Sequence, residues 1–349
     1  MKTILVTGGC GFIGSNFVRL LVAQGNYRII NLDKLTYAGN LENVADIDRD
    51  HYRFVRGDIC DRSLVDNLLE VEKPWAIVNF AAESHVDRSI LDASPFLQTN
   101  IAGVQSLLEA IRKYSVERFL HISTDEVYGD KEGKEPAGEE SPLWPSSPYA
   151  ASKAAADLLC FSYRRTYDLP IIVTRSSNNY GPFQFPEKLI PLVIHNALNG
   201  LELPVYGDGR QIRDWLYVED NCRAILLILE NGQIGFIYNV GTGEERTNLT
   251  VVESICAAIA ERTDRDLQEL RKRIRYVNDR PGHDRRYAID VSKVRASVGW
   301  KPAENFATGL KHTVDWYLDH ADWIARVTSG EYRNYYDAVY ARDWGRSPD

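Results

Sequence analysis

Cysteine is scarce in this sequence, and the few cysteines present are isolated. There are five in 349 residues, an odd number without a C-x-x-C pair, at the separated positions Cys10, Cys60, Cys160, Cys222 and Cys256. Zinc sites and disulfide frameworks need cysteines at short or paired spacings. We therefore expect free thiols in a reducing compartment, with no metal site and no disulfide. Because Cys10 has no basic or histidine neighbour in sequence that would activate its thiol, we expect an ordinary loop residue there.

The sequence also lacks an apolar run of the roughly 20 residues needed to cross a bilayer. From Met1 it leads directly into a strand pattern, without the charged and apolar regions of a secretory signal. We therefore expect a cytoplasmic protein that does not associate with membranes.

An excess of basic residues is missing too. Lysine and arginine number 41 against 49 aspartates and glutamates, which gives a formal charge of -8. This charge argues against a nucleic-acid-binding surface, although it is compatible with a local basic pocket for one diphosphate.

What the sequence does contain is an alternation of short β-branched runs with segments long enough for helices. Its apolar content of 44% is sufficient for one large core or two connected cores. Parallel strands need such crossover segments, so the alternation predicts an α/β fold: a doubly wound parallel Rossmann sheet with helices on both faces. The expected strands are Ile4–Thr7, Ile29–Leu32, Phe54–Val55, Ile77–Phe80, Phe119–Ile122 and Ile171–Thr174.

The pattern changes after Arg175. Residues 178–213 are rich in proline, glycine and aromatic side chains and show no long amphipathic repeat, which predicts loops of a smaller, C-terminal substrate-binding α/β domain. A helix over Asp220–Leu229 and a strand over Phe236–Val240 would return the chain to the first domain. We therefore expect a Rossmann domain in residues 1–175 that is rejoined around 214–241, and a substrate domain in residues 176–213 and 242–349.

A glycine-rich turn joins the first expected strand to the first expected helix, Phe12–Val22. Gly8, Gly11 and Gly14 form a G-x-x-G-x-x-G pattern at this turn. Glycines permit a tight turn and a close approach of the backbone to a pyrophosphate, and the helix N-terminus offers N–H groups to the anion. In this strand-to-helix context the pattern predicts a dinucleotide site.

Two aspartates at later strand ends extend that site. Asp33 ends the second strand at about the distance expected for a residue that binds the adenine ribose, and its charge would repel a 2′-phosphate, which favours NAD over NADP. The alternative is a surface aspartate that caps the next turn. Asp58, followed by Ile59, is placed to meet the adenine ring; its alternative role is the N-cap of a helix that begins near Asp61.

Tyr149 and Lys153 stand four residues apart, so a helix places both side chains on one face. Pro148 just before them suits a helix start. A lysine beside the phenol, together with a positive nicotinamide, can lower the phenol pKa so that the phenolate accepts a proton from a hydroxyl group. The Y-x-x-x-K pattern is common by chance, but here it follows a glycine loop, a fifth strand and Ser123-Thr124.

With these motifs the first half of the chain resembles the extended short-chain dehydrogenase/reductase family. The resemblance rests on the glycine loop, Asp33, the run Ala81-Ala82-Glu83-Ser84-His85, and the Tyr149/Lys153 pair. Within that family the chain is most similar to the dTDP-glucose 4,6-dehydratases, because Thr124-Asp125-Glu126 follows the fifth strand. Similar epimerases carry neutral residues in place of the two carboxyls, and similar decarboxylases keep only the Glu.

The resemblance implies a complete reaction. C4 of the sugar is oxidised, water is eliminated across C5 and C6, and the hydride returns to C6, which gives dTDP-4-keto-6-deoxyglucose. Elimination needs a base for the C5 hydrogen and an acid for the C6 hydroxyl, roles that two carboxyls with separated pKa values can divide. By resemblance Glu126 is the base and protonated Asp125 the acid, while Thr124 binds the C4 oxygen.

Several alternatives stay open at this point. The tripeptide Thr124-Asp125-Glu126 could be only a capped polar turn. The enzyme could instead be another sugar-nucleotide epimerase or decarboxylase, or a dehydratase of a UDP-linked sugar. A redox-sensing protein that binds NAD without catalysis is a different class, against which the intact Tyr149 and Lys153 argue.

The resemblance continues through the second half of the chain and implies two sets of ligand contacts. The catalytic set is Thr124, Asp125, Glu126, Tyr149 and Lys153. The implied NAD contacts are Gly8, Gly11, Phe12, Ile13, Gly14, Asp33, Lys34, Thr36, Asp58, Ile59, Ala81, Ala82, Thr99, Tyr149, Lys153 and Asn179. The implied sugar-nucleotide contacts are Ser84, His85, Thr124, Asn178, Lys188, Leu189, Pro204, Tyr206, Arg213, Asn248, Arg280 and His283; for any single one of these a surface role is an alternative.

The family also implies a lyase of deoxysugar biosynthesis, such as that of rhamnose, which acts as a homodimer through helices near Pro95–Lys113 and Tyr149–Tyr167. Two features depart from the usual family sequence. Ser176-Ser177 replaces a more common Cys-Ser, and a tyrosine-rich tail with Tyr332, Tyr335, Tyr336 and Tyr340 follows Glu331. Neither departure touches the acid–base pair, and the tail could cover the nucleotide pocket or a subunit contact.

Overall fold

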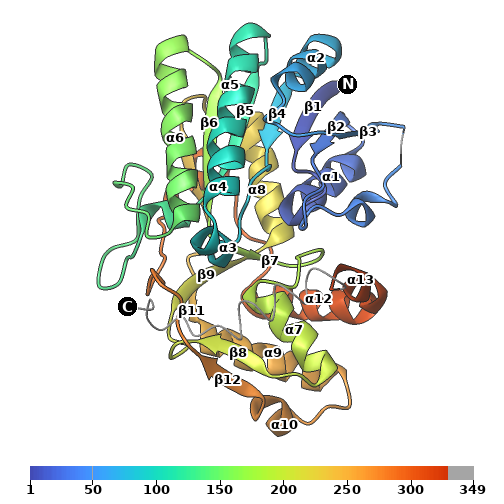
Figure 1. The fold of residues 1–349 in the computed structure, drawn as a ribbon, viewed down its shortest axis with the longest axis vertical. Helices are drawn as coiled ribbons and strands as arrows, with labels where there is room; N and C mark the ends of the chain where they lie inside the picture. Colours follow the sequence, from blue (N-terminus) through green and yellow to red (C-terminus); the bar gives the residue numbers. More distant parts are fainter. Residues whose placement is uncertain (49, 329–349) are drawn as a thin grey trace.

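The structure is a computed structural model that describes residues 1–48 and 50–328, and its centre is a seven-stranded sheet (Figure 1). The strand order is β10-β6-β5-β4-β1-β2-β3, and each neighbouring pair is parallel. This sheet confirms the predicted doubly wound α/β fold. Its strands are β1 (Lys2–Thr7), β2 (Tyr27–Asp33), β3 (Tyr52–Arg56), β4 (Ala76–Asn79), β5 (Arg118–Thr124), β6 (Ile171–Ser176) and β10 (Ile237–Val240).

Helices cover both faces of the sheet because its strands are apolar on both sides. Along β1, Ile4 and Val6 belong to the apolar cluster under one layer of helices, whereas Leu5 belongs to the cluster under the other. Successive side chains of a strand point to opposite faces, so this alternation sorts the core into two layers. The first layer is α1 (Phe12–Gln24), α8 (Val218–Asn231) and α11 (Ser292–Val298), and the second is α2 (Arg62–Glu72), α5 (Val104–Lys113) and α6 (Pro148–Tyr167).

The carboxyl ends of the strands define where a ligand can bind. The strand order reverses between β1 and β4, and in open α/β sheets ligands bind outside the carboxyl ends at such a switch point. Short elements follow these ends: η1 (Leu41–Val44), α3 (Val86–Leu91), α4 (Ser94–Phe96), the π-helix η2 (Leu97–Gly103) and η3 (Asp125–Tyr128). In Figure 1 this edge of the sheet faces a second, lower lobe.

The second lobe has its own apolar cluster, with Val193 on one helix and Val252 on another among its fully buried members. One small sheet has the order β11-β9-β7 and another pairs β12 with β8. The strands are β7 (Asn178–Tyr180), β8 (Leu203–Tyr206), β9 (Ile212–Tyr217), β11 (Glu245–Thr247) and β12 (Ile274–Val277). The helices are α7 (Leu189–Asn199), α9 (Asn248–Arg262), α10 (Leu267–Arg271), α12 (Phe306–Asp319) and α13 (Ala321–Val327).

One expectation about this lobe was wrong. Residues 178–213 were expected to form loops, but they contain β7, β8 and the eleven-residue helix α7. Most side chains of α7 are apolar and buried on more than one face, so its sequence shows no amphipathic repeat. A helix that is apolar all round is the case that periodicity misses.

The division of the chain into domains stays a prediction, and the packing suggests a refinement. β10 is a strand of the large sheet, and α8 packs on the face of that sheet, as expected for a chain that returns to the first domain. Val291, Val294 and Trp300 also belong to the apolar cluster of that sheet, although they follow the second lobe in sequence. We therefore propose that the chain returns to the first domain twice.

The remaining expectations concern membranes and the tail. Within residues 1–48 and 50–328, no helix combines the length and apolarity that a membrane span requires. The five cysteines are free, and four of them are buried. The tyrosine-rich tail from Tyr332 onward lies outside the described residues.

Candidate active site

The glycine turn after β1 forms one end of a cavity at the switch point. Gly8 has a φ of +71°, and a Cβ there would lie 2.6 Å from the backbone nitrogen of Ala81. A Cβ at Gly14 would lie 2.2 Å from the Gly8 carbonyl oxygen. At Gly11 the added atom would meet only that carbonyl, at 3.3 Å, so this position opens onto the cavity. The turn thus exposes backbone at the N-terminus of α1, where an anion is favoured.

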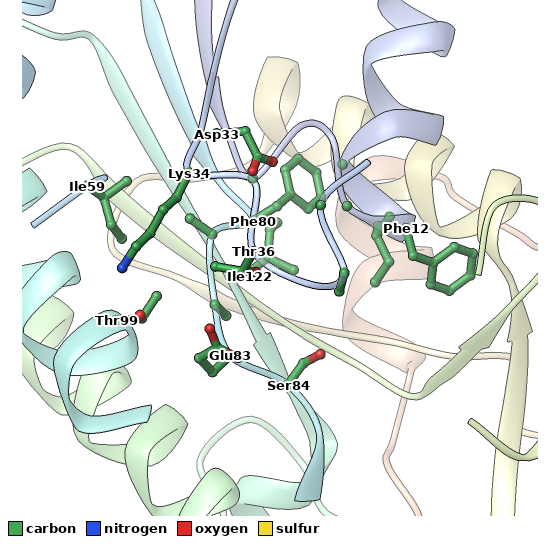
Figure 2. A pocket seen from close by; sticks show the side chains of 18 of the residues that line it. Phe12, Asp33, Lys34, Thr36, Ile59, Phe80, Glu83, Ser84, Thr99 and Ile122 are labelled. Atoms are coloured by element: carbon green, nitrogen blue, oxygen red, sulfur yellow. The ribbon is translucent and has the colours of Figure 1, made fainter. Parts of the chain in front are cut away.

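Asp33 and Lys34 stand at the end of β2 on the wall of this cavity (Figure 2). Asp33 is buried, and its carboxylate accepts hydrogen bonds from the backbone N–H groups of Cys10 and Leu35, each at 2.8 Å. Burial raises the pKa of the Asp33 carboxyl, and the two backbone N–H groups act against this. Asp33 is therefore both fixed in place and shielded from solvent, which differs from a surface aspartate.

Asp58 lies beside Lys34 and does not cap the next helix. Its carboxylate pairs with the Lys34 ammonium at 2.7 Å and accepts a hydrogen bond from the backbone of Cys60. The N-cap of α2 is Asp61, whose side chain accepts from the backbone of Leu64 at 3.1 Å. The N-cap role, which the sequence left open as an alternative for Asp58, is therefore taken by Asp61.

The first cavity brings together the predicted cofactor residues with one exception. Asn179 lines an adjoining second cavity instead. Figure 2 shows that Lys34 extends toward Ile59 and Thr99 on one side, whereas Glu83 and Ser84 lie further along the cavity. The predicted residues that line the first cavity are Gly8, Gly11, Phe12, Ile13, Gly14, Asp33, Lys34, Thr36, Asp58, Ile59, Ala81, Ala82, Thr99, Tyr149 and Lys153.

Tyr149 and Lys153 lie on the first turns of α6, which starts where the sequence predicts. The Ser147 side chain caps the helix by accepting from the backbone of Ala150 at 3.1 Å, and Pro148 takes a first-turn position. The Lys153 ammonium donates to the Ile122 carbonyl at 2.6 Å, and burial lowers its pKa to about 8. The pair is thus held against the end of β5.

The phenol of Tyr149 is not yet activated in the protein alone. Burial raises its pKa, the neighbouring Glu126 carboxylate raises it further, and a hydrogen bond with Thr124 acts against both. The predicted lowering of this pKa relied on a positive nicotinamide as well as on Lys153. A cation bound beside the phenol would act in that direction.

Asp125 and Glu126 form the short helix η3 at the end of β5, and both line the second cavity. The Thr124 hydroxyl accepts from the Glu126 backbone at 3.3 Å, so the capped turn that was an alternative to a catalytic role is present. Asp125 is 3% exposed, and within the described residues its Oδ2 atom has no hydrogen-bond partner. Burial, and secondarily the charge of Glu126, raise the pKa of Asp125 well above its usual value. Asp125 is therefore suited to carry a proton.

The second cavity contains the predicted sugar-nucleotide residues and continues from the first. Phe12, Ser84, Tyr149 and Lys188 line both cavities. The predicted residues on the second cavity are Ser84, His85, Thr124, Asn178, Lys188, Leu189, Pro204, Tyr206, Arg213, Asn248, Arg280 and His283. A ligand that spans this cavity would therefore reach Tyr149 at the junction with the first.

Basic side chains of this cavity are oriented by neighbours rather than by each other. The Lys188 ammonium donates to the Ser84 carbonyl at 2.8 Å. The Arg280 guanidinium pairs with Asp87 at 3.1 Å. Arg213 donates to the Asp284 carbonyl at 2.9 Å and lies over the Tyr287 ring at 4.0 Å. These three cations lie on one cavity, so this acidic protein has a local basic pocket of the kind expected for a diphosphate.

Sequence reasoning missed two buried carboxylates at this site. Asp87 accepts from Arg280 and from the Tyr206 hydroxyl, and Glu187 is buried between the two cavities. Each stands next to a cation in the sequence, Arg88 or Lys188, a pattern typical of a solvated surface. The only signal was their position inside segments that were already assigned to the site.

Comparisons with known proteins agree with this arrangement. The GDP-mannose 4,6 dehydratase family model matches residues 5–313. A dTDP-glucose 4,6-dehydratase from Xanthomonas campestris pv. campestris is 52% identical over 345 residues, which cover 95% of this chain and 98% of that protein. A crystal structure of a dTDP-glucose 4,6-dehydratase double mutant from Streptomyces venezuelae with NAD bound has a TM-score of 0.88 at 46% identity, covering 94% and 100% of the two chains. The UDP-glucose 4-epimerase of Thermotoga maritima, crystallised with UDP-glucose, has a TM-score of 0.83 at 30% identity, covering 92% and 100%.

Proposed function

The chain belongs to the dTDP-glucose 4,6-dehydratase family, and we propose that it converts dTDP-glucose to dTDP-4-keto-6-deoxyglucose with NAD as a resident cofactor. The observation that carries the proposal is the pair of adjacent carboxyl residues, Asp125 and Glu126, on the cavity that adjoins the glycine turn. Oxidation at C4 alone would need neither of them. Two carboxyls beside Tyr149 are what the elimination of water adds.

The first cavity fits a dinucleotide on three independent points. The backbone at Gly11 is open to the cavity, the N-terminus of α1 points there, and Asp33 lies at the end of β2 with Asp58 nearby. When bound, NAD supplies a hydride acceptor for C4 and a donor for C6. Because each turnover restores the starting cofactor, added NAD should not be consumed.

Tyr149 is the group proposed to accept the proton of the C4 hydroxyl. It lines both cavities, so it can face cofactor and sugar at once. Lys153, fixed by the Ile122 carbonyl, adds a positive charge close to the phenol while it is protonated. With its pKa lowered to about 8, that charge is present at neutral pH and is lost as the pH rises above this value.

Asp125 and Glu126 divide the elimination in our proposal. Burial and the adjacent Glu126 raise the pKa of Asp125 and favour its protonated form, from which it donates to the C6 hydroxyl. Glu126 accepts the C5 hydrogen. In the same proposal the Thr124 hydroxyl, which donates to the Asp125 carboxyl at 3.4 Å, binds the C4 oxygen.

The test is a panel of dTDP-, UDP-, CDP- and GDP-linked hexoses incubated with the purified protein, with product mass as the readout. We expect loss of one water from dTDP-glucose without added NAD. Epimerised sugar of unchanged mass would replace this proposal by a 4-epimerase, and preference for another nucleotide would change the substrate.

We further propose a cytoplasmic homodimer that forms through the helices η2, α5 and α6. Apolar side chains are exposed on η2 and α6, with Leu97 at 52%, Leu158 at 58% and Tyr167 at 45%. Exposed apolar side chains on helices that pack together favour a protein contact. Sedimentation across micromolar concentrations should show a dimer that Leu158→Glu weakens and that Val71→Glu, on the exposed face of α2, leaves intact. A wild-type monomer at all concentrations would contradict the proposal.

A further inference from the structure

Two segments from distant parts of the sequence meet over the first cavity. One is the loop of residues 34–40 after β2, which contributes Thr36 to the cavity (Figure 2). The other is the segment of residues 183–188 before α7, which contributes Gln184, Phe185 and Glu187. Neither segment belongs to a helix or strand, so contacts between their side chains determine how firmly they are joined.

Tyr37 makes the direct connection. Its hydroxyl donates to Oε1 of Glu187 at 3.0 Å, and its ring packs edge-on against Phe185 with 5.7 Å between the ring centres. Glu187 is buried, and burial raises the pKa of its carboxyl to about 7. A hydrogen bond to an acceptor shielded from water is strong and costly to lose.

Arg88, from α3, joins both partners from a third side. Its guanidinium lies over the Tyr37 ring at 3.7 Å, and its Nε atom is 3.4 Å from Oε2 of Glu187. The Nε2 atom of His85 lies 3.9 Å from the same Oε2 atom of Glu187. Three separate parts of the chain therefore converge on Tyr37 and Glu187.

The backbone of both segments is strained beside this connection. Leu35 has a φ of 60° and Phe183 a φ of 65°, a region that residues with side chains rarely adopt. Such conformations persist only where surrounding contacts hold them, and they are common at ligand clamps. One strained residue on each segment fits two parts that are held together rather than relaxed.

We propose that Tyr37, Glu187 and Arg88 form a clasp that retains the dinucleotide in its cavity during turnover. The inference rests on the proposed function, in which the cofactor is restored in each cycle and need not leave. Slow release therefore carries no penalty for rate. Tyr37 and Glu187 are positioning residues that close the cavity, and they do not act on the sugar.

The test measures exchange of bound NAD. Wild-type protein is loaded with radiolabelled NAD and chased with unlabelled NAD, and retained label is counted on filters over time. Tyr37→Phe keeps the ring that packs against Phe185 and Arg88 but removes the donor to Glu187; we expect about tenfold faster exchange, the loss of roughly one such hydrogen bond. Glu187→Gln keeps an acceptor for Tyr37 but removes the charge beside Arg88, and should give a smaller increase.

Tyr27→Phe is the matched control, because Tyr27 also donates its hydroxyl to a glutamate, Glu230, at the opposite end of the large sheet. Its exchange rate should equal that of the wild type. An unchanged rate in Tyr37→Phe, or an equal rise in Tyr27→Phe, overturns the clasp. If Tyr37→Phe unfolds, the increase expected in Glu187→Gln decides the question in the same way.

The exchange assay contains no sugar, so it separates the two proposals. If the wild type releases label slowly but does not dehydrate dTDP-glucose, the proposed reaction is refuted and the clasp still stands. A wild type that retains no NAD would overturn the clasp and the resident cofactor, while the panel of sugar nucleotides would still decide the reaction. Support for the clasp requires a further result: in Tyr37→Phe the NAD concentration needed for half-maximal activity rises more than the rate at saturating NAD falls.

Discussion

The two adjoining cavities are built in different ways. The first is formed largely by strand ends and by backbone, above all the turn from Gly8 to Gly14, whose shape depends on the absence of side chains. The second carries, among apolar neighbours, the carboxyl pair that follows β5 and basic side chains of the second lobe, such as Arg280 after β12. The first cavity therefore provides a fixed surface for a ligand, whereas the second provides proton donors and acceptors whose pKa values depend on burial.

Tyr149 lines both cavities, so its substitution should have the largest effect on the rate of the reaction. It is the variant in which the two cavities cannot be disturbed separately. Tyr149→Phe removes the proton acceptor, and loss of one general acid–base group typically costs about 10²–10⁴-fold in rate. With dTDP-glucose in a single turnover, we expect no build-up of NADH absorbance.

Tyr163→Phe is the control for this change, because Tyr163 is on the same helix and donates to Glu109 away from both cavities. Near-normal oxidation in Tyr149→Phe would show that another residue accepts the proton.

Asp33→Ala should disturb only the first cavity. It removes the carboxylate that orders the Cys10 and Leu35 backbone and that, in our proposal, accepts from the adenine ribose; a hydrogen bond to a charged group is worth about 1.5–3 kcal/mol. We expect NAD affinity to fall by about 10- to 100-fold by titration calorimetry, while dTDP binds as before. Weakened binding of dTDP to the same extent would mean that the two cavities are not separable.

Asp125→Asn should stabilise the protein while it impairs the second cavity. The folded-state pKa of Asp125 lies above its unfolded value of 3.8, so the wild type loses stability as the pH rises from about 4 through the folded-state pKa. Asparagine has no charge to bury, and a gain of about 1 kcal/mol corresponds to a rise of roughly 2 °C or more in Tm.

Thermal unfolding at several pH values checks this prediction. The difference in Tm between variant and wild type should be near zero at pH 4 and should grow toward neutral pH. A variant that is less stable at neutral pH would contradict the assigned burial cost.

The smallest expected effects on stability are those of substituting Asp58 and Asp61, and they should distinguish the roles of these two residues. Asp61→Ala removes the cap of α2 and should lower stability by about 1 kcal/mol without changing NAD affinity. Asp58→Ala removes the partially exposed pair with Lys34, worth about 0–1 kcal/mol in stability, and should weaken NAD binding. Chemical unfolding and NAD titration of both variants check this prediction. Weaker NAD binding in Asp61→Ala, with unchanged binding in Asp58→Ala, would contradict it.

The same contrast explains what could be predicted from the sequence. The glycine turn and the Tyr149/Lys153 pair are local patterns, in which spacing along the chain determines the geometry, and their residues do line the cavities. The parallel sheet followed from apolar runs that are buried on both faces.

Other features depended on contacts between remote segments. Asp87 and Arg280 are 193 residues apart, and Tyr37 and Glu187 are 150 apart, so neither pairing could be read from spacing. α7 was missed because its apolar residues face several directions at once. The burial that raises the pKa of Asp125 is likewise a property of the folded chain, and only the resemblance to a family suggested it.

The central claim is that Asp125 and Glu126 divide the elimination of water between an acid and a base. It is tested most directly by incubating Asp125→Asn and Glu126→Gln with dTDP-glucose in deuterated water, and measuring both product formation and deuterium at C5. We predict that both variants lose water about 10²–10⁴-fold more slowly. In sugar recovered before water is lost, deuterium should still enter C5 in Asp125→Asn but not in Glu126→Gln. Near-native water loss in both variants would contradict the account.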